Sequence, residues 1–361
     1  MLTHMTICTN RILLIAALFC LSPACKPKNE AKPSAAPQVE RETANAIYYW
    51  KTRFELGESE TAFLKEHDVK RLYLKFFDVD DDKALPYDDL DRIVPVATTV
   101  FASAKPEGVE VIPTVFLTVR AARYIAHSEG GAKEAAEKIV TRVLNMADYN
   151  DLGPVQEIQL DCDWNQSTKG AFYSLCKEVG DLVHPKGITV SSTIRLHQLK
   201  QDAPPVDRGV LMLYNTGALE NAVEKNSIIS KRDVAKYIQN KHFDYGIPLD
   251  FAYSTYRWGL VFIDGRFKFI LHQDDYSDKY IFSPQKDGSF LIRQDFEMEG
   301  HYLARGWTIR VEESPIATIL EVKKLVKQAF PDVSHSNIIY HLDSKNLAKY
   351  TSDEISSIYS D

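Results

Sequence analysis

Apolar runs typical of β-strands recur along the chain and alternate with helical patterns. Eight such runs occupy residues 46–50, 71–77, 109–117, 155–163, 188–195, 209–214, 247–253 and 337–342. Helical periodicity is clearest in the intervening residues 58–67, 132–146, 169–183, 231–241 and 316–329. Near-continuous apolar strands joined by helices indicate a parallel sheet whose outer face is covered. Eight units of this kind predict an α/β fold of the (β/α)8, or TIM, barrel type.

This alternation is weak in two places and broken in a third. Pro95 lies between the second and third strands, and Pro204-Pro205 leaves room for only a short helix after the fifth. Residues 258–312 instead alternate with a period of two, which indicates a β-rich insertion between strand seven and its helix. Its hairpin signals are Asp264-Gly265 and Asp287-Gly288. Such an insertion emerges at the C-terminal face of a barrel, and we expect it to form a lid over a pocket there.

The N-terminal residues have the pattern of a targeting segment. The apolar run 12–21 follows Arg11 and is too short for a permanent membrane span, as in a signal peptide over residues 1–24. Small residues before Cys25 resemble a bacterial lipobox, which implies acylation of Cys25; plain secretion is the alternative. Residues 25–43 predict a flexible tether ahead of a barrel domain over 44–361. We therefore expect a cell-envelope protein that is lipid-anchored to a bacterial membrane, periplasmic or surface-exposed.

Charge and cysteine content restrict the possible partners. The formal net charge is −7, and no Lys/Arg stripe is interleaved with aromatic residues, so nucleic acid is not expected as a partner. Beyond Cys25, only Cys162 and Cys176 remain, and either a disulfide or two buried thiols fits the sequence. No cofactor is expected, and the oligomeric state stays open.

Polar side chains concentrate where the predicted strands end. The fourth run ends in Asp161 and Asp163, which share one face of the strand. Two like charges there are costly unless they face solvent, a cation or a substrate. Other strand ends carry Lys75 and Asp78, Arg195 and His197, Tyr214 and Asn215, and His341 and Asp343. We expect these groups to converge at the barrel mouth; the alternative is a structural network in which Arg195 neutralises the two aspartates.

The segments Asp161-Cys-Asp163-Trp164 and Met212-Leu-Tyr214-Asn215 resemble motifs of the chitinase-like family 18 glycoside hydrolases. In that family strand four ends in D-x-D-x-E and strand six in Met-x-Tyr-Asp. The resemblance implies that Asp163 orients the N-acetyl group of a substrate and that Tyr214 supports the reacting centre. The family's general acid, however, is replaced by Asn165, and an amide cannot donate the catalytic proton. The chain as a whole resembles a group of uncharacterised bacterial lipoproteins with predicted barrels.

Our leading hypothesis is a glycoside hydrolase-like protein that acts on carbohydrate, with Asp163, Asp161, Tyr214 and Arg195 at its centre. The predicted binding residues around them are Trp50, Lys75, Trp164, Asn165, His197, Asn215, Asp250, Trp258 and His341. The missing acid leaves three alternatives: Asp163 itself with Asp78, Asp250 or Asp343; Glu297 or Glu299 from the insertion; or a metal held by Asp161, Asp163, His197 and His341. Two further alternatives are a non-catalytic glycan-binding lipoprotein and a scaffold whose polar cluster is structural.

An acidic run after the second strand resembles a calcium loop. Asp78, Asp80 and Asp82 alternate, and Asp88 and Asp89 follow. Lys83 stands where such loops need glycine, so a solvated loop is the alternative to a cation site.

Overall fold

The computed structural model describes residues 41–85, 92–272, 275–331 and 334–360. The predicted signal peptide, Cys25 and nearly all of the predicted tether lie outside these residues, as do Asp88 and Asp89. Among the helices of the described part, none is long and apolar enough to cross a membrane.

Eight parallel strands form the barrel, as the alternation of strands and helices predicts. They are β1 (Asn45–Tyr49), β3 (Val69–Asp81), β6 (Glu110–Leu117), β7 (Glu157–Cys162), β8 (Thr189–Arg195), β9 (Arg208–Met212), β10 (Leu249–Ser254) and β18 (Asn337–Tyr340). The strand β1 pairs with both β3 and β18, so the sheet closes on itself. Because all eight strands run in the same direction, their C-terminal ends meet at one mouth.

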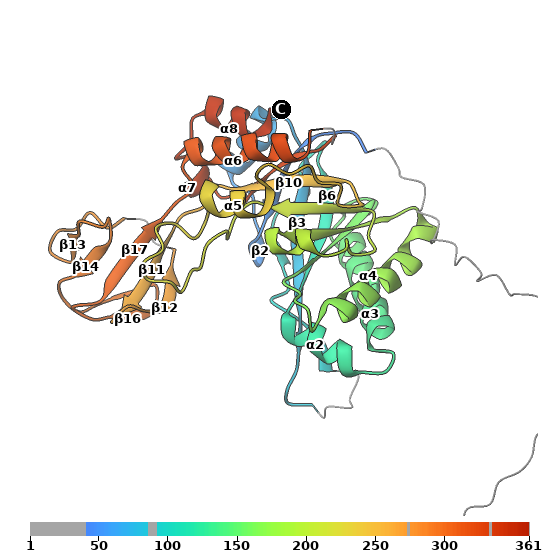
Figure 1. Cartoon of the computed structure of the whole chain (residues 1–361). Helices are drawn as coiled ribbons and strands as arrows, with labels where there is room; N and C mark the ends of the chain where they lie inside the picture. The colour runs from blue at the N-terminus through green and yellow to red at the C-terminus, as the bar shows by residue number, and fades with distance from the viewer. Residues whose placement is uncertain (1–40, 86–91, 273–274, 332–333, 361) are drawn as a thin grey trace, which may run out of the picture. The chain divides into compact units, whose positions relative to one another are not determined.

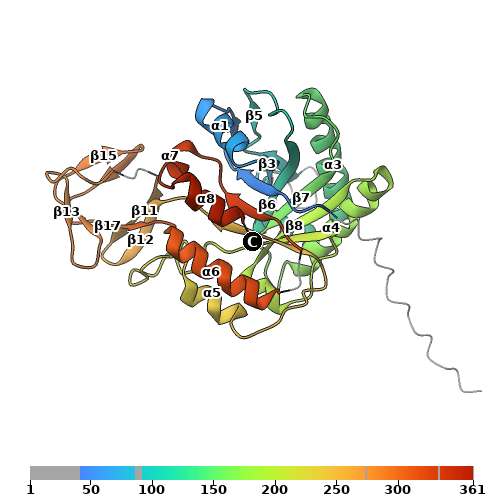
Figure 2. The ribbon, with the colours of Figure 1, turned by 90° about the horizontal axis from the view of Figure 1, so that it is seen from above.

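Helices cover the outside of the barrel (Figures 1 and 2). The predicted ones are α1 (Glu58–Glu66), α3 (Gly131–Tyr149), α4 (Lys169–Val183), α5 (Lys231–Ile238) and α6 (Ile316–Ala329). The sequence did not predict α2 (Val119–His127), α7 (Ser344–Leu347) and α8 (Ser352–Tyr359). The short helix expected after the fifth strand is the 3-10 turn η3 (Leu196–Lys200). In α3 the buried side chains, among them Ala136, Ile139 and Val143, recur at helical spacing and pack on the sheet.

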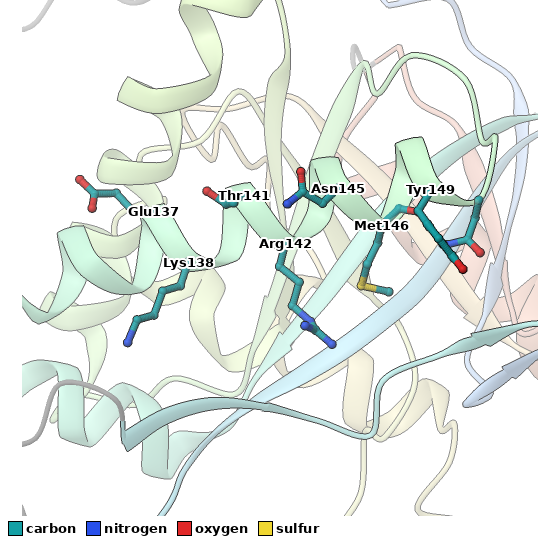
Figure 3. Close-up of a pocket in the computed structure, with 8 residues that line it drawn as sticks. Glu137, Lys138, Thr141, Arg142, Asn145, Met146 and Tyr149 are labelled. Carbon is teal, nitrogen blue, oxygen red and sulfur yellow. The ribbon is translucent and has the colours of Figure 1, made fainter.

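No α-helix follows the second strand within residues 92–109. Instead β4 (Ile93–Val96) pairs antiparallel with the end of β3, and β5 (Val100–Phe101) continues along the outside. Phe101 packs edge-on against Phe76 of β3, with ring centroids 5.6 Å apart. A separate groove of about 690 Å³ lies along α3, and its lining includes Arg142, Met146 and Tyr149 (Figure 3).

The barrel interior is polar and aromatic. The Tyr48 hydroxyl donates to Gln159 Oε1 at 2.8 Å, and Gln159 Nε2 donates to Ser191 Oγ at 3.3 Å. Tyr73 stacks on Tyr48 with ring centroids 4.9 Å apart. Burial without a partner would be costly for these polar groups, so the hydrogen bonds fix the interior side chains in place.

The insertion forms its own antiparallel sheet (Figure 1). Its strands are β11 (Trp258–Ile263), β12 (Arg266–Leu271), β13 (Phe282–Pro284), β14 (Phe290–Ile292) and β17 (Thr308–Glu312). Between β14 and β17 the chain also forms a separate two-stranded pair, β15 (Phe296–Met298) and β16 (His301–Leu303). Asp264 and Gly265 both have positive φ, 50° and 73°, as a two-residue hairpin turn requires. A separate apolar cluster, which includes Val261, Phe282 and Ile309, forms its core.

The expectation of a lid over the pocket is not confirmed. Both views show the five-stranded sheet to one side of the barrel (Figures 1 and 2). Contacts at its base hold it beside the loop after β9: Ser227 Oγ donates to Glu312 Oε2 at 2.5 Å, and Arg310 Nη1 donates to the Asn221 carbonyl at 2.6 Å. Because the base of β17 contacts this loop, the sheet lies beside the mouth of the barrel.

Candidate functional site

Asp161, Asp163 and Arg195 form one ion-paired group at the mouth. Asp161 is the penultimate residue of β7 and is 4% exposed, while the side chain of Asp163, just beyond the strand, is 52% exposed. The Arg195 guanidinium, at the end of β8, donates through Nη2 to Asp161 Oδ1 at 3.3 Å and through Nε to Asp163. Thr193 Oγ1 also donates to Asp161 at 2.5 Å. The two aspartates therefore lie on the same side of the strand end, as their spacing predicts, and share one cation.

The environment acts differently on the two members of the buried pair. Burial raises the pKa of Asp161, and the charge of Asp163 adds to this, whereas Arg195 opposes it. For Arg195 burial disfavours the charged form, but Asp161 and Asp163 outweigh burial and raise its pKa above the usual value. Arg195 therefore stays protonated and is the permanent positive charge of the mouth.

Asn165, at the position of the missing acid, is used to start a helix. Its side-chain Oδ1 accepts hydrogen bonds from the Ser167 backbone N–H at 2.9 Å and from Ser167 Oγ at 2.7 Å. Its backbone N–H donates to Thr168 Oγ1 at 3.0 Å, and its carbonyl accepts from the backbone N–H of Lys169, the first residue of α4. Asparagine is well suited to such a turn because its side chain reaches the backbone two residues on.

Tyrosines gather around Asp161 on the other side of the mouth. Tyr214, directly after β9, stacks on Tyr340 at the end of β18 with ring centroids 4.7 Å apart. Tyr340 also contacts Tyr48 at 5.7 Å and Tyr256 at 5.8 Å. Burial raises the pKa of Tyr340, and the charge of Asp161 adds to the shift, so the phenol stays neutral. Tyr340 is the centre of this aromatic cluster, and the sequence analysis missed it.

Trp50 and Lys75 lie next to this aromatic cluster, at the C-terminal side of β1 and within β3. The Lys75 ammonium lies 2.8 Å from Asp78 Oδ1 and 5.8 Å from the centroid of the Trp50 ring, and Trp50 contacts Tyr340 at 6.0 Å. Asp78 is level with Asp161 across the sheet, because both pair with Phe116 of β6. Trp50 and Lys75 therefore join the cluster as predicted.

His341 lies beside an ion pair at the same end of β18. Asp343 pairs with Lys51 at 2.8 Å. Burial lowers the pKa of His341 to about 4; the Asp343 charge opposes this, while Lys51 and His272 add to it. His341 is therefore neutral at pH 7, and its Nδ1 is buried with no hydrogen-bond partner.

Three other predicted binding residues lie at the rim. Asn215, with a φ of 53°, accepts a hydrogen bond from the Tyr256 hydroxyl at 2.5 Å. Trp258 lies against Tyr256, with centroids 5.0 Å apart, and donates from Nε1 to Glu312 Oε2 at 2.8 Å. His197 is exposed in η3, and burial together with the neighbouring Arg195 lowers its pKa, against a smaller opposing effect of Asp163.

The structure places two predicted binding residues elsewhere. Asp250 is the second residue of β10 and lies at the opposite end of the barrel, where Arg208 Nη1 and the Ser336 backbone N–H donate to its Oδ1 at 3.3 and 2.7 Å. Trp164 is 1% exposed and packs edge-on against Tyr173 of α4 at 5.5 Å. Strand direction explains the first error, and the alternation of side chains explains the second, because Trp164 follows Asp163 and takes the opposite face.

The three alternatives for supplying a missing acid gain no geometric support. Glu299 Oε2 accepts the His272 backbone N–H at 2.9 Å, and neither Glu297 nor Glu299 forms a hydrogen bond or ion pair with Asp161, Asp163 or Arg195. Asp78 and Asp343 are each paired with a lysine. Across the described ranges no cluster of three or more His, Cys, Asp or Glu side chains could hold a metal ion.

The acidic run that resembles a calcium loop lies only partly in a loop: Asp82 and Lys83 follow the strand, and Asp88 and Asp89 lie outside the described residues. Residues Asp78 to Asp81 belong to the strand β3. Asp80 accepts hydrogen bonds from Thr118 and Arg120, and Asp81 pairs with Arg92 at 2.6 Å. These carboxylates alternate across the strand and are each neutralised by a separate cation.

Both cysteines of the barrel are free thiols. Cys162 and Cys176 are buried, and burial raises the pKa of each thiol above its usual value. Of the two alternatives that the sequence left open, the structure therefore has two buried thiols and not a disulfide.

Comparison with known proteins shows similarity in fold. No protein-family model matches the sequence, and no curated protein is similar to it. The chitinase from Chromobacterium violaceum ATCC 12472 is 10% identical, with a TM-score of 0.50 over 87% of this chain and 97% of that one. The spore cortex-lytic enzyme SleL of Bacillus megaterium QM B1551 is 14% identical, with a TM-score of 0.49 over 88% of this chain and 75% of that one. A class V chitinase from Nicotiana tobaccum is 10% identical, with a TM-score of 0.49 over 89% and 99%. The match at 0.50 confirms the resemblance at the level of architecture: the chain has a TIM barrel similar to that of chitinase-like glycoside hydrolases.

Proposed function

We propose that the protein binds glycans that contain N-acetylamino sugars at the mouth of its barrel and does not hydrolyse them. The observation that carries this proposal is the state of Asn165. Its side chain is engaged in the turn that begins α4, at the position where the related enzymes carry their proton donor. Without a carboxylic acid at that position, the leaving oxygen of a glycosidic bond has no donor.

The rest of the mouth retains groups suited to binding. Trp50 and Tyr340 are half-buried aromatic side chains, of the kind on which a sugar ring can stack. The half-exposed carboxylate of Asp163 is paired with Arg195 and can accept hydrogen bonds from amide and hydroxyl groups of a sugar. Ligand pockets combine such apolar walls with a few placed polar groups.

Hydrolysis with Asp161 as acid is the second candidate, because burial raises the pKa of that carboxyl. Its geometry is less favourable than that of Asp163. Asp161 is 4% exposed and already accepts hydrogen bonds from Thr193 and Arg195, so a substrate oxygen would have to displace one of them. We therefore rank binding above hydrolysis.

Calorimetric titration with chitotetraose, together with chromatography of the glycan after incubation, tests this proposal. We expect saturable binding with no shorter products, and roughly tenfold weaker binding for Asp163→Asn, in line with the loss of a charge-assisted hydrogen bond. A matched control is Asp295→Asn, which neutralises an exposed carboxylate of the insertion. Release of shorter oligosaccharides by the native chain, abolished in Asp161→Asn, would establish the hydrolase instead.

We also propose that Cys25 carries a lipid that holds the protein at the bacterial cell envelope. The apolar run 12–21 and the small residues before Cys25 support this proposal. Metabolic labelling with an alkyne fatty acid should mark the native chain and not Cys25→Ser. Equal labelling of both forms would refute acylation at this position.

A further inference from the structure

A cavity of about 590 Å³ lies in the β-rich insertion, lined by residues other than those of the Asp161 cluster. Its volume is in the range of small-molecule sites. The lining comes from Arg257, from the segment 275–284 and from β14 with the residues that follow it. None of these residues has a role in the glycan site proposed above.

Aromatic side chains that pack on one another form one wall of this cavity. Tyr276 stacks on Phe290 at 5.4 Å and meets Phe282 edge-on at 5.2 Å. Gly259 of β11 makes this arrangement possible, because a Cβ at that position would lie 2.1 Å from the Tyr276 hydroxyl. The Tyr276 hydroxyl therefore lies directly over the sheet, and Phe290, which is partly exposed, also lines the cavity.

Three cationic side chains line the same cavity. Arg293 Nη1 donates to the Lys279 carbonyl at 3.0 Å, which places these two residues together on one rim. Arg257 is half-buried, and its Nε is buried with no hydrogen-bond partner. Within the described part of the chain, none of the three forms an ion pair with a carboxylate, although the protein carries a net charge of −7. The acidic lining residue, Asp275, uses its Oδ1 to accept the Ser277 backbone N–H at 2.9 Å.

We propose that this cavity is a second binding site, which takes a saccharide unit bearing a carboxylate. The carboxylate pairs with Arg257 and Arg293, and the sugar ring lies against Phe290 and Phe282. A buried guanidinium N–H without an acceptor is costly, and a carboxylate supplies the acceptor that the protein lacks there. The choice of a saccharide rests on the proposed function, whereas the need for an anion with a ring-shaped body rests on the cavity alone.

Titration of the full chain with trigalacturonate and, separately, with chitotetraose tests this site. We expect trigalacturonate to bind with a Kd that rises at least tenfold in Arg293→Gln and between 50 mM and 500 mM NaCl, since charge-assisted pairing at a partly open site is screened by salt. Arg257→Gln should weaken binding similarly. Arg305→Gln, which removes an exposed cation of the insertion outside the cavity, is the matched control and should bind as the native chain does.

The two sites give separable results. If Arg293→Gln binds trigalacturonate as tightly as the native chain, or if Asp163→Asn loses it instead, the cavity is not the site of the acidic sugar and the inference is overturned. Binding of trigalacturonate that depends on Arg293, with no binding of chitotetraose, would uphold the cavity and refute the proposed function. Because Arg293 is exposed, its substitution is not expected to disturb folding.

Discussion

Removal of the Arg195 charge should destabilise the fold in a manner that depends on pH. The Arg195 side chain is 16% exposed and forms ion pairs with Asp161 and Asp163. The Asp161 side chain is 6% exposed, and the Asp163 side chain is 52% exposed. Breaking a buried pair by removing one partner costs about 3–5 kcal/mol, whereas a half-exposed pair contributes about 0–1 kcal/mol. Since Arg195 is partly open to water, we expect Arg195→Gln to lower the free energy of unfolding by about 3 kcal/mol at pH 7.5, nearly all of it through Asp161.

The pH dependence follows from Asp161. Burial raises the folded-state pKa of Asp161 above the unfolded value of about 3.9. The stability that the protonated carboxyl contributes is therefore fully present below the unfolded pKa, and it is lost as the pH rises through the folded pKa. Arg195 opposes the rise, so Arg195→Gln moves the folded pKa higher and enlarges the loss at neutral pH. As the pH falls from 7.5 to 4.5, a growing fraction of Asp161 in the variant is protonated, so the deficit should shrink.

Urea unfolding of the native chain and the variant at pH 4.5 and 7.5, followed by tryptophan fluorescence, measures both values. Arg195→Lys keeps the charge and should recover part of the stability. Arg293→Gln, an arginine without an ion pair among the described residues, should stay within about 0.5 kcal/mol of native. A deficit under 1 kcal/mol at pH 7.5, or an equal deficit at both pH values, would refute the view that Arg195 neutralises a buried carboxylate.

Substitutions at three further positions test the neighbouring parts of the structure. Tyr340→Ala should weaken chitotetraose binding about tenfold in calorimetry through loss of an aromatic face, while Tyr340→Phe should bind nearly as well. Asn165→Ala should lower the urea midpoint by the equivalent of about 1 kcal/mol, and Asn165→Asp, which keeps the accepting oxygen, should not. Gly259→Ala should displace Tyr276 and abolish trigalacturonate binding with chitotetraose binding intact; unchanged binding of both glycans would show that the cavity does not depend on this contact.

Much of the barrel could be predicted from the sequence because its determinants are local. Apolar runs and helical periodicity are properties of short segments, and each of the eight predicted runs overlaps a barrel strand. The second unit is different: the sequence shows Pro95 as a helix breaker, but only the structure shows that β4 and Phe101 take over the covering of β3. What replaces a missing element depends on long-range packing, which a local pattern does not contain.

The site was predictable where it depended on strand direction and alternation. Asp161, Asp163 and Arg195 converge because they end adjacent parallel strands. Asp250 was misplaced because it lies near the beginning of its strand, whereas the site lies at the C-terminal strand ends. Tyr340 was missed because a tyrosine in an apolar run resembles any core residue, and its role is visible only in its contacts with Tyr214 and Trp50. The cavity of the insertion is lined by Arg257 and Arg293, which are far apart in the sequence, and no sequence spacing indicates that they share a cavity.

One proton NMR experiment on chitotetraose in the presence of the full chain tests the central claim most directly. Saturation transfer from the protein reports binding, and the anomeric signals of the same sample report hydrolysis over days. We predict transfer to the N-acetyl and ring protons that is weaker with Asp163→Asn, and a constant ratio of internal to reducing-end anomeric signals. Growth of reducing-end signals with time would contradict the assignment of Asn165 as a lost acid, and the absence of any transfer would contradict glycan binding at the barrel mouth.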